Sequence, residues 1–245
     1  MPDVAVPGAP VPDASVPDGR GGPHAFVADL TRPELSADDR HHLARVLRLR
    51  AGDSLTVSDG VGAWRTCRFG DQLEPVGEIV RTPTPTPTLT VGFALVKGGR
   101  PELIVQKLTE LGVDRIIPFV AARSVVRWDD ARSARQAERL ERVAREAAMQ
   151  CRRCHLPEVA ASTTFAEVAR EPGVVLAERD GRAPDRATRV VLVGPEGGWT
   201  DDERRSVSDH VGFGAQVLRS ETAALAVAAV LGALRAGIVA PGPTG

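Results

Sequence analysis

The stretch that decides the fold is VLVGPEGGWTDDE, residues 191–203. Its apolar residues lead directly into the glycine-rich turn Gly-Pro-Glu-Gly-Gly (194–198), and an acidic segment follows. Thr200 and Glu203 match a capping box, in which two side chains bond free N–H groups at the start of a helix. The predicted order is therefore strand, turn and helix. In α/β sheets, ligands bind at this position, outside the carboxyl ends of the strands.

The turn differs from the phosphate-binding loops that have a known signature. It lacks the Gly-Lys-Ser/Thr ending of a Walker A loop and the Gly-x-Gly-x-x-Gly spacing of a dinucleotide-binding loop. Because glycine allows close approach, a ligand here would meet bare backbone and the carboxylate of Glu196. That chemistry suits a neutral or cationic cofactor better than a triphosphate. The alternative is that the turn is only a tight connection.

A second unusual stretch is VLRSETAALAVAAVL, residues 217–231. The strand-like residues 216–219 run with almost no loop into an apolar helix, which is predicted over 223–236. Free amides at such a helix start can bind a carboxylate or the polar edge of a ligand. The alternative, compatible with the first, is that Ser220 or Thr222 simply caps the helix. A helix that is apolar on every side should be buried.

The C-terminal part of the chain alternates predicted strands and helices. The strands are predicted over 89–96, 115–120, 173–178 and 189–194, and the helices over 100–113 and 129–151. The last two strands are continuous apolar runs, as in a parallel sheet covered on both faces. This alternation predicts an α/β domain.

The helix predicted over 100–113 has clear start and stop signals. Pro101 stands in its first turn, and Gly112 ends it. We expect its apolar stripe to include Leu103 and Leu111.

The N-terminal part has a β-rich pattern with one helix. A strand is predicted over 24–30, and a hairpin over 52–69 with its turn at Asp59-Gly60. A helix is predicted over 36–50, with Ser36 as its cap. Its apolar face should carry Leu43, Val46 and Leu47, and its polar side Arg45, Arg48 and Arg50. These elements indicate a small β-barrel, whose arginines either contact a partner or form a solvated helix face.

Proline and glycine mark the borders between the parts of the chain. Residues 81–90, RTPTPTPTLT, are stiffened by alternating proline. The predicted organisation is a disordered tail over 1–22, a first domain over 23–82, a proline-rich linker over 83–88 and a second domain over 89–245. The tail has neither a basic start nor a continuous apolar core, so it does not read as a signal peptide.

The composition argues against several classes of protein. No apolar run reaches the roughly 20 residues that a membrane span needs. With no tyrosine and 4% aromatic residues, a stacking platform for single-stranded nucleic acid is not expected. Three cysteines, an odd number, fit a reducing cytoplasm. CRRCH (151–155) matches a haem-attachment motif, but without an export signal or a second Cys/His pair at zinc spacing we expect neither haem nor metal.

Together, the two unusual stretches resemble the cofactor-binding loops of the SPOUT class of RNA methyltransferases. More narrowly, the chain resembles the bacterial enzymes that methylate N3 of a uridine in 16S ribosomal RNA. HHLARVLRLRAGD (41–53) is similar to that family's PUA-like RNA-binding domain. LVKGGRPELIVQKLTELGVDRIIPF (95–119), ARSVVRW (122–128) and REAAMQCRRCHLPEV (145–159) are similar to its catalytic domain. The resemblance covers residues 24–238 in the same order.

This resemblance implies an α/β fold with a C-terminal trefoil-knotted SPOUT methyltransferase domain and a small N-terminal β-barrel PUA-like domain. S-adenosylmethionine would bind in the knot. The enzyme would be a cytoplasmic homodimer that acts on 16S ribosomal RNA within the small ribosomal subunit. The cofactor-binding residues carried over by motif are Leu176, Ala177, Glu178, Gly194, Pro195, Glu196, Gly197, Gly198, Val217, Leu218, Arg219, Glu221, Thr222 and Ala223.

The implied reaction also suggests catalytic roles. N3 of uracil is a weak acid, so the enzyme must align the partners, remove a proton and stabilise charge on the uracil oxygens. We expect Arg219 to hold the developing negative charge. Glu196 and Glu221 are both candidates for accepting the proton or for attracting the positive charge of the cofactor, and the sequence does not choose between them.

Contacts to RNA phosphates are expected from arginines in both domains. The candidates are Arg45, Arg48, Arg100, Arg123 and Arg127. Their alternative role is that of ordinary surface or salt-bridged arginines. Two other functions stay open: a SPOUT methyltransferase acting on transfer RNA or on a ribose 2′-OH, and a non-catalytic RNA-binding module. The PUA-like first domain and the motif LRSETAALA (218–226) favour the enzyme that methylates a base in ribosomal RNA.

Overall fold

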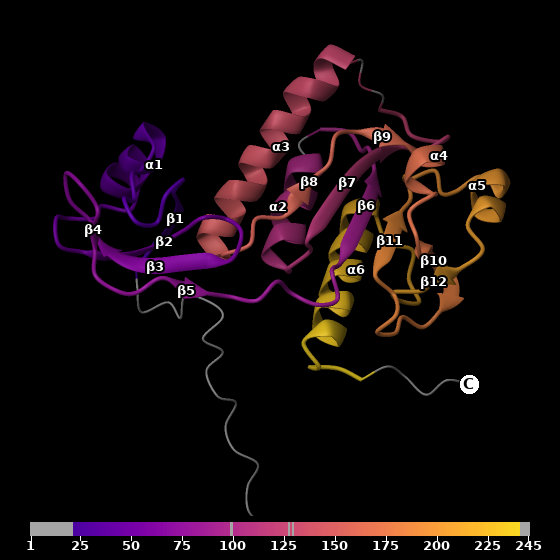
Figure 1. Cartoon of the computed structure of the whole chain (residues 1–245). Coiled ribbons are helices and arrows are strands. Elements are labelled where there is room, and N and C mark those ends of the chain that lie inside the picture. The colour runs from indigo at the N-terminus through magenta and orange to yellow at the C-terminus, as the bar shows by residue number, and fades with distance from the viewer. Residues whose placement is uncertain (1–21, 99, 127, 129, 241–245) are drawn as a thin grey trace, which may run out of the picture. The chain divides into compact units, whose positions relative to one another are not determined.

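The computed structural model describes residues 22–98, 100–126, 128 and 130–240 (Figure 1). The chain forms two compact units. The first comprises the chain up to Thr84 together with Arg152–His155, and the second comprises Pro85–Cys151 and the chain from Leu156 onward. The predicted tail, apart from residue 22, lies outside the described residues.

The first unit contains a sheet of five described strands. They are β1 (His24–Phe26), β2 (Ser54–Ser58), β3 (Ala63–Arg68), β4 (Glu74–Pro75) and β5 (Val80–Arg81). β1 runs parallel to β2, and β3 pairs antiparallel with β2, β4 and β5. The hairpin at Asp59-Gly60 is confirmed: the Asp59 carboxylate accepts hydrogen bonds from the backbone N–H groups of Val61 (2.9 Å) and Ala63 (3.0 Å), and Gly60 has a φ of 79°.

The helical segment of this unit is only partly as predicted. Ser36 caps α1 (Ala37–His41), since its hydroxyl accepts the Asp39 N–H at 3.0 Å. The chain then continues as a π-helical turn over His42–Val46. Because the helical period changes there, the predicted shared face is wrong: Leu43 is fully buried, whereas Val46 and Leu47 are exposed.

The segment Arg152–His155 packs within this first unit. The Gly62 N–H donates to the Cys154 carbonyl at 3.2 Å, and the His155 ring nitrogen Nε2 lies 3.1 Å from the Thr82 carbonyl oxygen. Burial raises the pKa of the Cys154 thiol to about 11. A buried thiol of this kind is unreactive. Within the described ranges, no group of His, Cys, Asp and Glu is arranged to hold a metal ion.

The second unit is built on a parallel sheet of seven described strands (Figure 1). They are β6 (Thr90–Ala94), β7 (Arg115–Val120), β8 (Glu158–Val159), β9 (Thr163–Thr164), β10 (Val174–Arg182), β11 (Val190–Val193) and β12 (His210–Val211). The order is β12-β10-β11-β6-β7-β8, with β9 also paired to β7. The α/β class with a parallel sheet is thus confirmed.

Helices cover both faces of this sheet. They are α2 (Arg100–Glu110), α3 (Asp130–Cys151), α4 (Phe165–Val168), α5 (Asp201–Ser206) and α6 (Ser220–Arg235). Val191 packs with the core side chains of α2, α3 and α6, while its neighbour Leu192 packs with α4 and Trp199. Successive strand residues point to opposite faces, which explains why the apolar runs are continuous.

Several predictions about these helices are wrong. On α2 the buried side is formed by Ile104, Val105 and Leu108, whereas Leu103 and Leu111 are exposed, because the side that packs against the core contains none of the predicted stripe. α6 begins at Ser220 rather than at residue 223, and the strand-like residues 216–219 form an irregular segment. α6 is also not buried on every side, since Ala229 is exposed.

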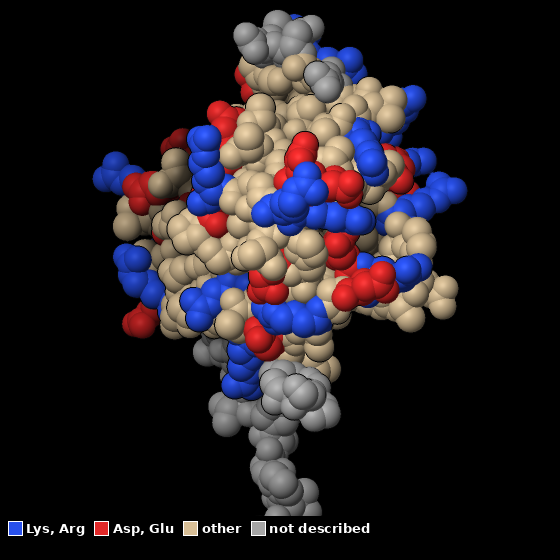
Figure 2. All heavy atoms as spheres, turned by 90° about the vertical axis from the view of Figure 1, so that its right-hand side faces the viewer, with Lys and Arg blue, Asp and Glu red and all other residues tan. Residues whose placement is uncertain are grey.

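The surface around α5 and β12 carries mixed charge. Figure 2 shows that basic and acidic side chains alternate on this face. Several of them form ion pairs: Arg204 with Glu178, Arg182 with Asp209, and Arg205 with Asp202. This face therefore lacks the single-sign patch that phosphate binding favours. Among the described helices, none is both long and apolar enough to cross a membrane.

Candidate functional site

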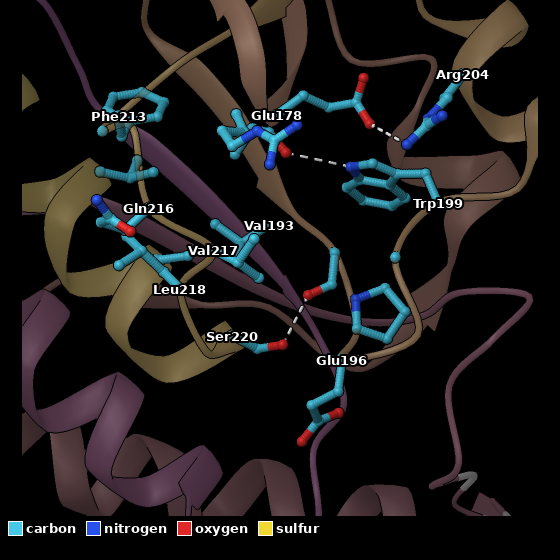
Figure 3. A pocket seen from close by; sticks show the side chains of 18 residues that line it. Glu178, Val193, Glu196, Trp199, Arg204, Phe213, Gln216, Val217, Leu218 and Ser220 are labelled. Atoms are coloured by element: carbon cyan, nitrogen blue, oxygen red, sulfur yellow. Dashed lines mark hydrogen bonds and ion pairs between the residues drawn. The ribbon is translucent and has the colours of Figure 1, made fainter.

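A cavity of about 270 Å³ lies at the carboxyl end of β11 and beside the middle of β10 (Figure 3). Three segments form its walls: the middle of β10, the glycine-rich turn after β11, and the irregular segment that leads into α6. Its lining residues are Ala177, Glu178, Arg179, Val193, Gly194, Pro195, Glu196, Gly198, Trp199, Arg204, Phe213, Gly214, Gln216, Val217, Leu218, Ser220, Ala223 and Val227. The two stretches singled out in the sequence thus meet at one cavity.

Glycine is required in the turn for two different reasons. Gly198 has a φ of 68°, a left-handed conformation, and its N–H donates to the Pro195 carbonyl at 2.8 Å. At Gly194, a Cβ atom would lie 2.9 Å from the ring of Trp199. The turn is therefore shaped by the indole behind it as well as by its own hydrogen bond.

Trp199 joins the turn to the neighbouring strand. Its indole Nε1 donates to the Ala177 carbonyl at 3.3 Å, and its ring stacks on Phe119 with the planes 3° apart and the ring centroids 6.1 Å apart. The capping box beside it is confirmed: the Glu203 carboxylate accepts the Thr200 N–H at 2.8 Å, and the Thr200 hydroxyl accepts the Glu203 N–H at 3.2 Å. The predicted site did not include Trp199, although it stands directly after the turn in the sequence.

Ser220 connects the turn to α6. Its hydroxyl donates to the Gly194 carbonyl at 2.9 Å (Figure 3). The N-cap of α6 is Arg219, which makes no side-chain capping bond to a described residue. The alternative that Ser220 or Thr222 caps this helix is therefore wrong, because the serine hydroxyl is directed at the turn instead.

Glu178 is the carboxylate in the β10 wall. Its Oε1 lies 2.7 Å from Arg204 Nη2, and its Oε2 lies 3.1 Å from His210 Nδ1. The other His210 ring nitrogen, Nε2, lies 2.9 Å from the Val207 carbonyl oxygen. Two basic groups from α5 and β12 thus hold the carboxylate at the wall of the cavity.

A second group of charges lies at the turn itself. Arg100, the first residue of α2, places Nη1 2.9 Å from Glu196 Oε1 and Nε 3.8 Å from Glu221 Oε1. Two predicted catalytic carboxylates and one predicted RNA-binding arginine therefore come together. Their positions in the sequence gave no sign of this pairing, because the three residues lie on α2, the turn and α6.

The other predicted arginines differ in their surroundings. Arg219 is exposed, and its guanidinium makes no hydrogen bond or ion pair with the part of the chain that the structure describes. Arg123 donates to the Gly197 carbonyl at 2.9 Å and the Trp199 carbonyl at 3.0 Å, so it supports the turn. Arg45 and Arg48 are exposed in the first unit, and Arg127 lies outside the described residues.

Not every predicted cofactor-binding residue lines the cavity. Leu176 is fully buried in the core, in the cluster that also contains Leu192 and Trp199. The remaining predicted residues that are absent from the lining are Gly197, Arg219, Glu221 and Thr222. Residues that sequence reasoning missed include Phe213, Gly214 and Gln216, which precede the recognised stretch and carry no motif of their own.

The lining combines apolar surface with a few fixed polar groups. Val193, Leu218 and Val227 form an apolar slot in the lining, in which Val193 is 2% and Val227 0% exposed. Glu178 and Glu196 offer acceptors for hydroxyl groups or for a cation, and the turn offers bare backbone. The cavity suits a ligand with a flat ring, hydroxyl groups and positive charge.

Two family models match the chain. One, described as an RNA methyltransferase domain, matches residues 82–232, and the other, described as an RNA methyltransferase PUA domain, matches residues 35–71. The chain is 33% identical over 225 residues to the Ribosomal RNA small subunit methyltransferase E of Mycobacterium bovis, a match that covers 82% of this chain and 86% of the relative. The protein of the same name from Bacillus subtilis is 30% identical over 222 residues, covering 78% of this chain and 86% of the relative.

Solved structures resemble this fold over most of its length. A Ribosomal RNA small subunit methyltransferase E from Neisseria gonorrhoeae, bound to S-adenosyl methionine, superposes with a TM-score of 0.72 at 26% identity, over 86% of this chain and 97% of the other. A putative methyltransferase from Legionella pneumophila in complex with the same cofactor gives a TM-score of 0.74 at 26% identity, over 86% and 96%. Given a family model that matches more than half of its residues and relatives at this identity, the chain belongs to the RNA methyltransferase family and carries that family's PUA domain near its N-terminus.

Proposed function

We propose that this protein transfers a methyl group from S-adenosylmethionine to N3 of a uridine in the 16S ribosomal RNA of the small subunit. The observation that carries the proposal is the cavity at the carboxyl end of β11 and beside β10, closed by the glycine-rich turn and the start of α6. Relatives named Ribosomal RNA small subunit methyltransferase E, and a neighbour of that name bound to the cofactor, support it.

The residues present fit this cofactor. Its purine matches the apolar slot of Val193, Leu218 and Val227, and its ribose hydroxyls match the carboxylate of Glu178. Glu196 lies in the lining, where it would face positive charge. Bound there, S-adenosylmethionine supplies an electrophilic methyl group on its positively charged sulfur. The trefoil knot implied by the resemblance is part of this proposal, and the Ser220–Gly194 contact, which joins the two knot-forming stretches, supports it.

The protein's own groups would handle the charge on the uracil. Removal of the N3 proton leaves negative charge on the ring oxygens, which a cation at the site stabilises. Arg219 is available for this role, since it is exposed and makes no hydrogen bond or ion pair with a described residue. We therefore expect Arg219→Ala to reduce methylation far more than cofactor binding. Equal losses of both would assign Arg219 to cofactor positioning instead.

RNA contacts would come from the arginines that are not already engaged. Arg45 and Arg48 are exposed on the first unit, which carries the PUA domain. Arg100 and Arg123 bond groups of the site, so we assign them a supporting role beside any phosphate contact. For Arg127, which lies outside the described residues, phosphate binding stays a prediction.

We also propose that the enzyme works as a homodimer in the cytoplasm. Val217 is 84% exposed beside the cavity, and Ile238 is 78% exposed just after α6. Exposed apolar side chains such as these, just outside the two ends of α6, favour contact with a second subunit. A dimer formed there would place the partner subunit next to the cofactor cavity, whose lining includes Val217.

The experiment that tests the function uses ribosomal RNA from cells that lack this protein. The RNA, the purified protein and radiolabelled S-adenosylmethionine are incubated together, and the modified base is mapped by nuclease digestion and mass spectrometry. The proposal expects one 3-methyluridine in 16S RNA. A methyl group on transfer RNA or on a ribose oxygen would support the alternative methyltransferases. If calorimetry detects no cofactor binding, the result would support the alternative that the protein is a non-catalytic RNA-binding module.

A further inference from the structure

The two carboxylates beside Arg100 are not equivalent. Glu196 is 43% exposed, and its Oε1 accepts a hydrogen bond from Arg100 Nη1 at 2.9 Å. The Glu221 side chain is 17% exposed, and its Oε1 is 3.8 Å from Arg100 Nε, which is too long for a hydrogen bond. Glu196 is thus solvated and paired, whereas Glu221 is largely desolvated and only loosely paired.

The second oxygen of Glu221 has an unusual environment. Glu221 Oε2 is buried and has no hydrogen-bond partner among the described residues. Buried polar atoms in native proteins are nearly always hydrogen-bonded, so an unpartnered carboxylate oxygen indicates a donor that comes from outside the chain. Glu102 Oε2 shares this feature, but the other Glu102 oxygen is held by Arg139 at 2.9 Å. Of these two, only Glu221 has both oxygens without a hydrogen bond from a described residue.

Glu221 is not itself part of the cavity lining, but its neighbours in the sequence are. It stands between Ser220 and Ala223, which both line the cavity, and next to Arg219, the exposed cation at the start of α6. A weak acid that entered here would meet an acceptor for its proton beside a positive group for its remaining charge. A general base needs this combination of a free lone pair and partial desolvation.

We infer that Glu221 is the catalytic residue that accepts the N3 proton of the target uridine, and that Arg100 is the positioning residue that keeps Glu221 and Glu196 in place. The inference rests on the proposed function. In the step, the N3–H bond breaks and its proton passes to the Glu221 carboxylate. The freed electron pair of N3 forms the bond to the methyl carbon, and the electron pair of the broken sulfur–carbon bond stays on sulfur. The products are 3-methyluridine and S-adenosylhomocysteine, and Glu221 then returns the proton to water.

The test compares Glu221→Gln with Glu196→Gln and Glu102→Gln in the full chain. Loss of a general base costs about 100- to 10,000-fold in kcat, and we expect a fall in this range for Glu221→Gln. Calorimetric affinities for S-adenosylmethionine and for the RNA should stay within about threefold, because glutamine keeps the shape of the side chain. Glu196→Gln should lose less than about tenfold. Glu102→Gln removes an equally buried carboxylate away from the cavity and should keep kcat within about twofold.

A substrate with a more acidic N3 distinguishes a chemical role of Glu221 from a structural one. RNA with 5-fluorouridine at the target position has a more acidic N3, so its methylation depends less on a base. The ratio of wild-type to Glu221→Gln rates should shrink by about tenfold or more on this RNA. Arg100→Ala should lower kcat, and Arg100→Lys, which keeps the charge but loses the forked geometry, should restore part of it.

Specific outcomes would overturn the inference. A Glu221→Gln enzyme within about threefold of the wild type, an unchanged rate ratio on 5-fluorouridine RNA, or a larger loss in Glu196→Gln would each remove Glu221 as the base. In all three cases the wild-type enzyme still methylates N3, so the proposed function stands. A wild-type enzyme that leaves uridine N3 unmodified would contradict both the proposed function and the role of Glu221.

Discussion

The Ser220 hydroxyl lies 2.9 Å from the Gly194 carbonyl oxygen and so ties the start of α6 to the turn that follows β11. Ser220 is 4% exposed, so the bond is protected from water. Both residues line the cavity. This hydrogen bond helps two separate sequence stretches to form one wall for a ligand.

Ser220→Ala should therefore weaken cofactor binding. The substitution leaves the part-buried Gly194 carbonyl without this donor, which costs about 1 kcal/mol of stability. We expect the dissociation constant for S-adenosylmethionine to rise by about tenfold, measured by calorimetry. Ser206→Ala is the matched control, since the Ser206 hydroxyl donates to the Glu203 carbonyl at 2.8 Å outside the lining. Equal cofactor affinity in the two variants would show that the Ser220 bond does not shape the site.

Gly194→Ala should displace the indole of Trp199. The added methyl group would lie 2.9 Å from the ring, and overpacking of this kind costs about 1–3 kcal/mol. Trp199 would then lose its bond to the Ala177 carbonyl, and cofactor affinity should fall together with a change in tryptophan fluorescence. Gly77→Ala is the control, because its new methyl group would have its nearest neighbour at 3.8 Å. Unchanged fluorescence and affinity in Gly194→Ala would contradict the role assigned to this glycine.

Arg45→Gln and Arg48→Gln together should weaken RNA binding and flatten its dependence on salt. Each lost phosphate contact lowers the slope of log K against log salt concentration by about 0.7–0.9. Filter-binding titrations at several salt concentrations measure this slope. Arg32→Gln changes another exposed arginine of the same unit and is the control. An unchanged slope in the double variant would remove both arginines from the RNA interface.

The stability of the first unit should fall in mild acid because of His24. This imidazole is buried between Thr56 Oγ1 (2.8 Å) and Ser58 Oγ (2.9 Å), and burial, followed by the nearby positive charge of Arg152, lowers its pKa from 6.5 to about 4. Below pH 6.5 the His24 imidazole is protonated in the unfolded chain, whereas in the folded unit it stays neutral down to about pH 4. The contribution of His24 is thus complete above pH 6.5 and is lost towards pH 4, by about 3 kcal/mol in all.

Hydrogen exchange of the β1 and β2 amides at several pH values measures this loss of stability in the first unit alone. His24→Gln should lower stability at neutral pH but remove most of the slope between pH 4 and 6.5. His41→Gln, at an exposed position of the same unit, should leave the slope as it is. The explanation fails if the wild type and His24→Gln show the same slope.

Local features could be predicted from the sequence because they depend on residues that are close together in the chain. The caps at Ser36 and Thr200 and the hairpin at Asp59 need only hydrogen bonds that span a few residues. The parallel sheet could be predicted from the continuous apolar runs of its strands. That the turn and the start of α6 belong to one site came from the family resemblance, which rests on motifs in a fixed order.

The remaining features depend on packing between distant segments. Leu103 was expected in the buried stripe of α2, but that stripe is set by where α3 and α6 lie. The switch to a π-helical turn after His41 has no propensity signal. Arg100 was assigned to RNA because its two carboxylate partners are brought to it only by folding. The Trp199 stack on Phe119 was missed for the same reason.

The most direct test of the account is a crystal structure of the protein soaked with S-adenosylmethionine. The account predicts density for the cofactor in the cavity, with its purine against Val193, Leu218 and Val227 and its ribose near Glu178. Density at another place on the chain, or an empty cavity at a saturating cofactor concentration, would contradict it.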